Sequence, residues 1–245
     1  MSVKRNSLRL KVASVLLLVV IPCMLAAGVA LGNRTYAVVS PVVLLLSMLP
    51  FFLVFEKRKP KARELVPIAV MAAVAAAGRL AFAALPQFKP IVAVVIITAF
   101  AFGPEAGFLT GAVAMLASNL FFGQGPWTPW QMFCCGMIGF LAGLLRRSGW
   151  LRHRWSVCLF GFLSGYLYGL IIDVWSVSAF TSRFTWQLLL AAYASGFLFD
   201  TILGAATAFF LFVLERPLCK KLERIRMKFG LLEETDPGQP DSEDW

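Results

Sequence analysis

Long apolar runs dominate the chain, and short polar segments separate them. These runs are apolar on all sides and do not alternate with a period of two, so they predict helices rather than the strands of a barrel. The pattern therefore predicts an all-α integral membrane protein, a bundle of about eight transmembrane helices. The candidate spans lie at about 12–31, 36–55, 65–84, 91–103, 106–122, 131–145, 156–174 and 187–214.

Composition agrees with a membrane protein. Of the 245 residues, 59% are hydrophobic and 15% are charged, whereas soluble domains carry ~25% charged residues. A soluble protein of this size has too little interior for so many apolar side chains. A membrane crossing takes about 20 residues, so eight spans leave little room for a soluble catalytic domain.

The basic residues predict the orientation. With a cytoplasmic N-terminus, the inside segments carry 19 of the 23 Lys and Arg, and the outside loops carry three. Because cytoplasmic loops are enriched in Lys and Arg, we expect both termini in the cytoplasm of a multi-pass cell-membrane protein. The first run has the basic start and small-residue end of a signal peptide, but it is longer than the usual ~7–15 apolar residues. Its cleavage stays open and would leave the remaining topology unchanged.

A charged segment, Glu56–Glu64 (EKRKPKARE), divides the chain. It predicts an N-terminal two-helix hairpin at 1–58, a six-helix core at 59–217 and a cytoplasmic tail at 218–245. The end of that tail, after Leu232, is acidic and contains Pro and Gly, a composition typical of disorder.

Motifs of catalysis and metal binding are missing from the sequence. It contains no phosphate-binding G-x-x-x-x-G-K-[ST], no H-E-x-x-H and no G-x-S-x-G. The one histidine, His153, lies in a basic segment, and the five cysteines lack metal-ligand spacing. Only Asp173 and Asp200 place carboxylates in the membrane region, too few for a magnesium–diphosphate site. We therefore expect no catalytic residue, no metal and no cofactor.

The segment 119–132 (NLFFGQGPWTPWQM) carries most of the candidate chemistry. Its glycines permit tight turns and its prolines stiffen them, so we expect a structured external loop. Aromatic rings beside fixed amides suit a small-molecule pocket, although the tryptophans also suit an interfacial aromatic belt. The residues concerned are Asn119, Gln124, Trp127, Trp130 and Gln131.

Two further features lie near the outer end. The run 91–103 spans about 20 Å as a helix, against a hydrocarbon layer of ~30 Å. Either this helix starts earlier, or its recessed end leaves an outward-facing hollow. Arg79 lies near the outer end of its run, where it either snorkels outward or faces the interior, to pair with Asp173 or to hold an anionic substrate group.

Small residues recur every four positions in the same run, at Ala69, Ala73 and Ala77. Such faces let helices approach closely in lipid. They predict either a docking face for a partner membrane protein or packing inside this chain.

Several stretches together resemble the substrate-specific component, or S component, of energy-coupling factor (ECF) vitamin transporters. They are the A-x-x-x-A-x-x-x-A stretch with Arg79 and Phe82, FKP at Phe88–Pro90, FGPEAGFLTGA at 102–112, SNLFFGQGPWTPWQM at 118–132 and GFLAGLL at 139–145. The resemblance covers residues 65–215, and the N-terminal hairpin lies outside it.

The resemblance implies that six helices bind a vitamin or related micronutrient from outside, under the loops 85–90, 120–130 and 175–186. It also implies that Ala69, Ala73 and Ala77 dock on a transmembrane coupling subunit joined to two ATPase subunits. The aromatic loop resembles members assigned to cobalamin and other corrinoids. The candidate substrate-binding residues are Arg79, Lys89, Asn119, Gln124, Trp127, Trp130, Gln131, Tyr168, Asp173 and Trp175.

Two other functions stay open. A stand-alone secondary transporter would use intramembrane carboxylates for proton coupling, and Asp200 gives this alternative thin support. A membrane enzyme is disfavoured by the missing motifs. Copurification of a coupling subunit and ATPases distinguishes an S component from both.

Overall fold

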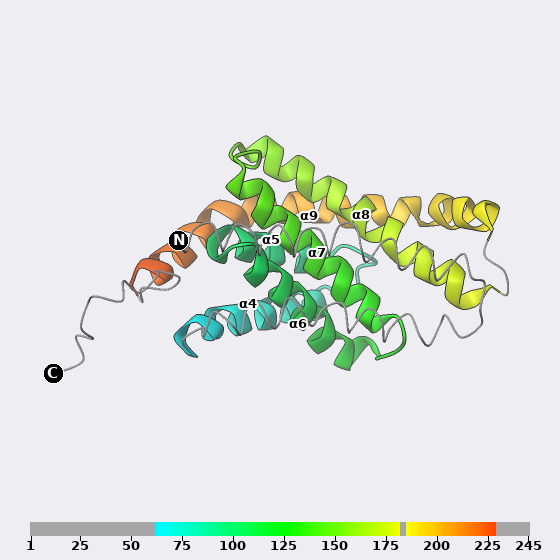
Figure 1. Cartoon of the computed structure of the whole chain (residues 1–245), viewed down its shortest axis with the longest axis horizontal. Coiled ribbons are helices and arrows are strands. Elements are labelled where there is room, and N and C mark those ends of the chain that lie inside the picture. The colour runs from blue at the N-terminus through cyan, green and yellow to red at the C-terminus, as the bar shows by residue number, and fades with distance from the viewer. Residues whose placement is uncertain (1–61, 182–184, 229–245) are drawn as a thin grey trace, which may run out of the picture.

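The computed structural model describes residues 62–181 and 185–228, which form six α-helices and no strand (Figure 1). The predicted all-helical class is confirmed for this part of the chain. The expected spans at 12–31 and 36–55 and the end of the tail lie outside the described residues, so a total of eight spans stays a prediction. The helices are α4 (Ala62–Ala81), α5 (Ile91–Phe102), α6 (Pro104–Phe122), α7 (Thr128–Arg147), α8 (Arg154–Phe180) and α9 (Trp186–Lys228).

Four of these helices, α6 to α9, are long and apolar enough to cross a membrane. The apolar part of α4, Leu65–Ala81, and the whole of α5 are shorter. All six coincide with predicted runs, but α8 and α9 extend further than expected. The tail predicted from residue 218 begins as a continuation of α9, which passes through Pro217 without ending.

The short helix α5 forms the centre of the bundle. All of its 12 residues except Phe100 are buried, and it contacts α4, α6, α7 and α9. Residues apolar on every side suit a helix that is covered on every side. The short fourth run is thus confirmed: α5 begins directly after Pro90 and ends before Gly103, and neighbouring helices cover it.

A single residue, Gly103, joins α5 to α6. Its φ angle is +96°, a conformation that side chains with a Cβ rarely adopt. Pro104 follows as the first residue of α6, where a proline is favoured because its missing N–H has no helical partner. This Gly-Pro pair reverses the chain within one residue and brings α6 alongside α5.

Two helix pairs make the most extensive contacts, α6 with α7 and α8 with α9. In the first pair, a Cβ built on Gly139 would lie 2.5 Å from the backbone oxygen of Gly107. In the second, a Cβ on Gly165 would clash with the backbone nitrogen of Gly204. Glycines therefore set these close crossings, as is usual for helices that pack in lipid.

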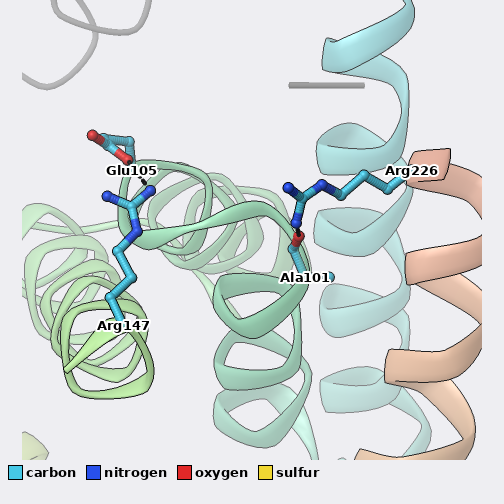
Figure 2. A network of polar contacts seen from close by, with 4 residues as sticks. All are labelled: Ala101, Glu105, Arg147 and Arg226. Atoms are coloured by element: carbon cyan, nitrogen blue, oxygen red, sulfur yellow. Dashed lines mark hydrogen bonds and ion pairs between the residues drawn. The ribbon is translucent and has the colours of Figure 1, made fainter. Parts of the chain in front are cut away.

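Polar contacts join α6 to α7 and α5 to α9 at one end of the bundle (Figure 2). Arg147, at the end of α7, reaches toward Glu105 at the start of α6, with 4.0 Å between Nη2 and Oε2. Arg226, in the extension of α9, donates a hydrogen bond of 3.4 Å from Nη1 to the backbone oxygen of Ala101 in α5. The extension of α9 beyond its predicted end thus contacts the central helix.

Two predicted loops are shorter than expected. The segment 119–132 was predicted as a loop, but α6 continues to Phe122 and α7 begins at Thr128. Likewise α8 runs to Phe180 and takes in the first half of the predicted loop 175–186. Pro129 lies in the first turn of α7, a position that proline favours. Residues 170–180 contain no Gly or Pro that would end α8 earlier.

Candidate functional site

Arg79 lies in the last turn of α4 and its side chain crosses to α6. Its Nη1 donates hydrogen bonds of 2.6 Å to the Ser118 hydroxyl and of 2.6 Å to Oδ1 of Asn119. The interior orientation is therefore confirmed. The expected pairing with Asp173 is not found among the described residues: the hydrogen bonds of Arg79 go to the polar side chains of Ser118 and Asn119 in α6.

Asn119 connects Arg79 to α7. Its Nδ2 donates to Oε1 of Gln131 at 2.7 Å and to the Thr128 hydroxyl at 3.2 Å. The Thr128 hydroxyl also accepts the backbone N–H of Gly125 at 3.2 Å. Since Asn119 and Thr128 are buried, this chain of hydrogen bonds joins α4, α6, α7 and the loop between α6 and α7 into one polar cluster in an apolar interior.

Lys89 comes from the turn between α4 and α5 and meets Arg79 at Phe122, the last residue of α6. The Lys89 Nζ lies 4.8 Å from the centre of the Phe122 ring, and the Arg79 guanidinium carbon lies 4.6 Å from it. Both are cation–π distances. Burial first, and then the positive charge of Arg79, lowers the pKa of Lys89.

An aromatic wall stands beside the polar cluster. Trp127, directly before Thr128, lies 6.3 Å from the ring of Trp175 in an edge-on contact, and Trp175 contacts Phe180 at 5.7 Å. Trp127 is half-buried, whereas Trp175 is 5% exposed. The loop 175–186 was expected to supply Trp175, but this residue belongs to α8.

Two predicted site residues lie elsewhere. Trp130 sits in the first turn of α7, is fully buried and belongs to the hydrophobic core, so its assignment to an external loop was wrong. Pro129, directly before Trp130, favours the first turn of a helix as well as a loop. Gln124 stays in the exposed loop, where its amide donates to the backbone oxygen of Leu116 at 3.0 Å.

The intramembrane carboxylates form a separate group between α8 and α9. Asp173 packs against Gly196, and Asp200 packs against Gly169; the two lie close enough to repel one another. Tyr168 lies within electrostatic range of both Arg79 and Asp200. Among the described residues, no hydrogen bond or ion pair joins these carboxylates to Arg79.

Sequence reasoning missed three residues of the site: Ser118, Phe122 and Thr128. All three lie in or directly before the segment 119–132, but Ser and Thr in apolar helices usually bond to their own backbone, and Phe is common on helices that face lipid. Only the crossing of α4 over the end of α6 brings Arg79 onto Ser118 and Phe122. Thr128 joins the site through its hydrogen bond from Asn119.

The two faces of α4 differ. One face is buried against the bundle and consists of Met71, Ala72, Ala75 and Ala76. The other face is exposed and carries the predicted docking residues Ala69, Ala73 and Ala77, next to Val66, Val70 and Val74. Within the described residues, the predicted docking face therefore takes no part in packing inside the chain.

Among the described residues, no group of three or more His, Cys, Asp or Glu side chains is placed to hold a metal ion.

Comparison with known families defines the class of protein. The family model "ECF transporter, substrate-specific component" matches residues 63–214, which is more than half of the chain and takes in nearly all of the six helices. With its apolar helices, the chain is a membrane-integral protein of a transport class rather than of an enzyme class. It belongs to the family of substrate-specific components of ECF transporters.

Curated relatives include UPF0397 proteins. The one from Vibrio atlanticus is 35% identical over 88 residues, which are 34% of this chain and 48% of the relative. Those from Aliivibrio fischeri and Aliivibrio salmonicida are 34% identical over the same length and coverage. The chain thus spans about half the length of the curated relatives it matches. No solved structure matches.

Proposed function

We propose that this chain is the substrate-binding membrane subunit of an ATP-driven ECF importer and that it binds a micronutrient from the outside. The observation that carries this proposal is the family match over residues 63–214, the same region that folds into the six-helix bundle. In the predicted domain division, residues 59–217 bind the substrate, and the hairpin at 1–58 is an addition to that core.

The substrate site lies at the end of the bundle where α4, α6, α7 and α8 meet. Its polar floor is formed by Arg79, Asn119 and Gln131, and Lys89 and Tyr168 lie at its sides. Trp127 and Trp175 provide rings that can stack on a bound ring system. The hydrogen bonds between these residues hold the polar groups in place before a ligand arrives, which lowers the entropic cost of binding.

The coupling subunit docks on the exposed face of α4 formed by Ala69, Ala73 and Ala77. The support is that these small side chains point away from the bundle, where they allow a second helix to approach closely. The substrate site begins at Arg79 in the last turn of α4, whereas the docking face runs from Ala69 to Ala77 on the exposed side of the helix. Binding and docking therefore use different parts of the same helix.

Energy comes from outside the chain. The sequence has no phosphate-binding loop, so two ATPase subunits attached to the coupling subunit supply the hydrolysis. Both termini face the cytoplasm, in line with the basic residues at the Arg146–Arg154 turn and along the end of α9. In this orientation, the proposed substrate site faces the outside of the cell.

A test of this function uses copurification and transport. The tagged full-length chain is expressed with an ECF coupling subunit and its ATPases, and uptake of a vitamin panel that includes cyanocobalamin is measured in vesicles. We expect capture of all three partners and uptake that requires ATP. Uptake by this chain alone, driven by a proton gradient through Asp173 and Asp200, would establish the secondary-transporter alternative instead.

A further inference from the structure

The candidate site holds two positive charges that share one aromatic ring. Arg79 and Lys89 approach Phe122 from α4 and from the turn after it, at 4.6 Å and 4.8 Å from its centre. Two cations so placed repel each other, and their partial burial strengthens the repulsion. Such a pair is stabilised when a negative charge lies between or beside its members.

No carboxylate of the described residues provides that charge. Asp173 and Asp200 lie between α8 and α9, against Gly196 and Gly169, and neither forms an ion pair with Arg79 or Lys89. The neighbours of Arg79 are the uncharged Ser118 and Asn119. Within the described part of the chain, the site is therefore positively charged and electrically unbalanced.

The hydrogen bonds of Arg79 leave part of its guanidinium available. Both described bonds use Nη1, so the hydrogens on Nη2 and Nε have no partner among the described residues. These hydrogens lie side by side and form the fork that binds a carboxylate or phosphate with two parallel hydrogen bonds. The bonds to Ser118 and Asn119 fix the rotation of the Arg79 guanidinium. Its Nη2 and Nε hydrogens are therefore oriented before a ligand binds.

A second donor lies in the aromatic wall. Trp175 is 5% exposed, and its Nε1 has no hydrogen-bond partner among the described residues. A buried N–H without a partner is unfavourable. Trp175 contacts Trp127, which adjoins the Asn119–Thr128 cluster, so this donor belongs to the same site and also favours a ligand that brings acceptor atoms.

We propose that the transported substrate is an anion whose carboxylate or phosphate group is bound by Arg79 and Lys89 while its ring system lies against Trp127 and Trp175. The inference rests on the proposed substrate-binding function and adds the charge class of the substrate. It separates acidic micronutrients from their neutral or cationic counterparts.

The test uses pairs of compounds that differ only in the acidic group. Binding to the purified full chain in phospholipid-free detergent is measured by tryptophan fluorescence and by thermal shift for nicotinate and nicotinamide, biotin and biotinamide, and flavin mononucleotide and riboflavin. We expect the acidic member of at least one pair to bind, about tenfold or more tighter than its neutral partner. The first two pairs report a carboxylate and the last a phosphate.

Charge-removing variants locate the effect. Lys89→Met should weaken binding of the acidic member about tenfold and leave the neutral member unchanged, while Lys89→Arg should restore the difference. Lys220→Met removes the same charge from an exposed position of α9. It should change the affinity for neither the acidic nor the neutral compound. Because Lys89 is half-exposed and lies in a turn, its variants should fold normally.

The outcomes separate this inference from the proposed function. Tight binding of a neutral or cationic compound, unaffected by Lys89→Met, would refute the anionic class but keep the binding function. A thermal shift with phosphatidylglycerol and with none of the acids would show that the two cations hold a lipid headgroup, and the inference would be wrong. Failure to copurify with the coupling subunit and to take up any compound would instead count against the proposed function.

Discussion

Trp127 and Trp130 lie three positions apart and have opposite surroundings. Trp127 precedes α7, is half-buried and touches Trp175. Trp130 is fully buried in the first turn of α7 and belongs to the core. One turn of helix therefore separates a ring that can meet a ligand from a ring that supports the bundle.

The two tryptophans should respond differently to truncation. Trp127→Ala should weaken substrate binding by about 1–3 kcal/mol, by analogy with the stacking of bases on aromatic rings, and leave the melting temperature nearly unchanged. Trp130→Ala should lower the free energy of unfolding by about 3–5 kcal/mol, because it opens a cavity in the core. Thermal denaturation and equilibrium binding on both variants check this. Equal binding by Trp127→Ala and the parent chain would mean that this ring serves only the membrane interface.

At the scale of helices, α6 and α7 depend on a close crossing. A Cβ on Gly139 would lie 2.5 Å from Gly107 O, a backbone atom that cannot move aside. Gly139→Val should therefore force the helices apart and lower the free energy of unfolding by about 1–3 kcal/mol or more. Ala191→Val, at an exposed position of α9, is the control and should be neutral. Similar melting temperatures for both variants would show that the crossing adjusts.

The two faces of α4 allow a matched test of docking. Ala73 is exposed, whereas Ala72 is 2% exposed. Ala73→Trp should abolish ATP-driven uptake and capture of the coupling subunit, because a bulky side chain holds the partner helix away. Substrate binding to the isolated chain should survive, since Ala73 lies about two turns from Arg79. Ala72→Trp should overpack the bundle and reduce stability and binding together. Uptake by Ala73→Trp at the parental rate would remove this face from the docking surface.

At the scale of the whole molecule, the basic residues predict which end faces the cytoplasm. Arg152 lies exposed in the turn between α7 and α8, and Ala84 lies exposed in the turn after α4. A membrane-impermeant maleimide applied to intact cells should label Ala84→Cys but not Arg152→Cys, and permeabilisation should expose the latter. The parent chain, with its native cysteines, gives the background. The reverse pattern would invert the topology.

The helix class, the number of helices in the core and the short central helix could all be predicted from the sequence. Membrane helices satisfy their own backbone hydrogen bonds, so each leaves a local apolar signature that needs no knowledge of its neighbours. The choice of Arg79, Asn119 and Gln131 was possible for a related reason: polar side chains are costly in apolar surroundings and stand out there.

Tertiary structure alone decided which of these polar residues meet. The crossing of α4 over α6 gives Arg79 the partners Ser118 and Asn119 rather than Asp173, and it brings Lys89 onto the same Phe122 ring. Contacts between helices also placed Trp130 in the core and Trp175 inside α8. Such contacts join residues far apart in the chain, and their free energy depends on packing that local sequence does not encode.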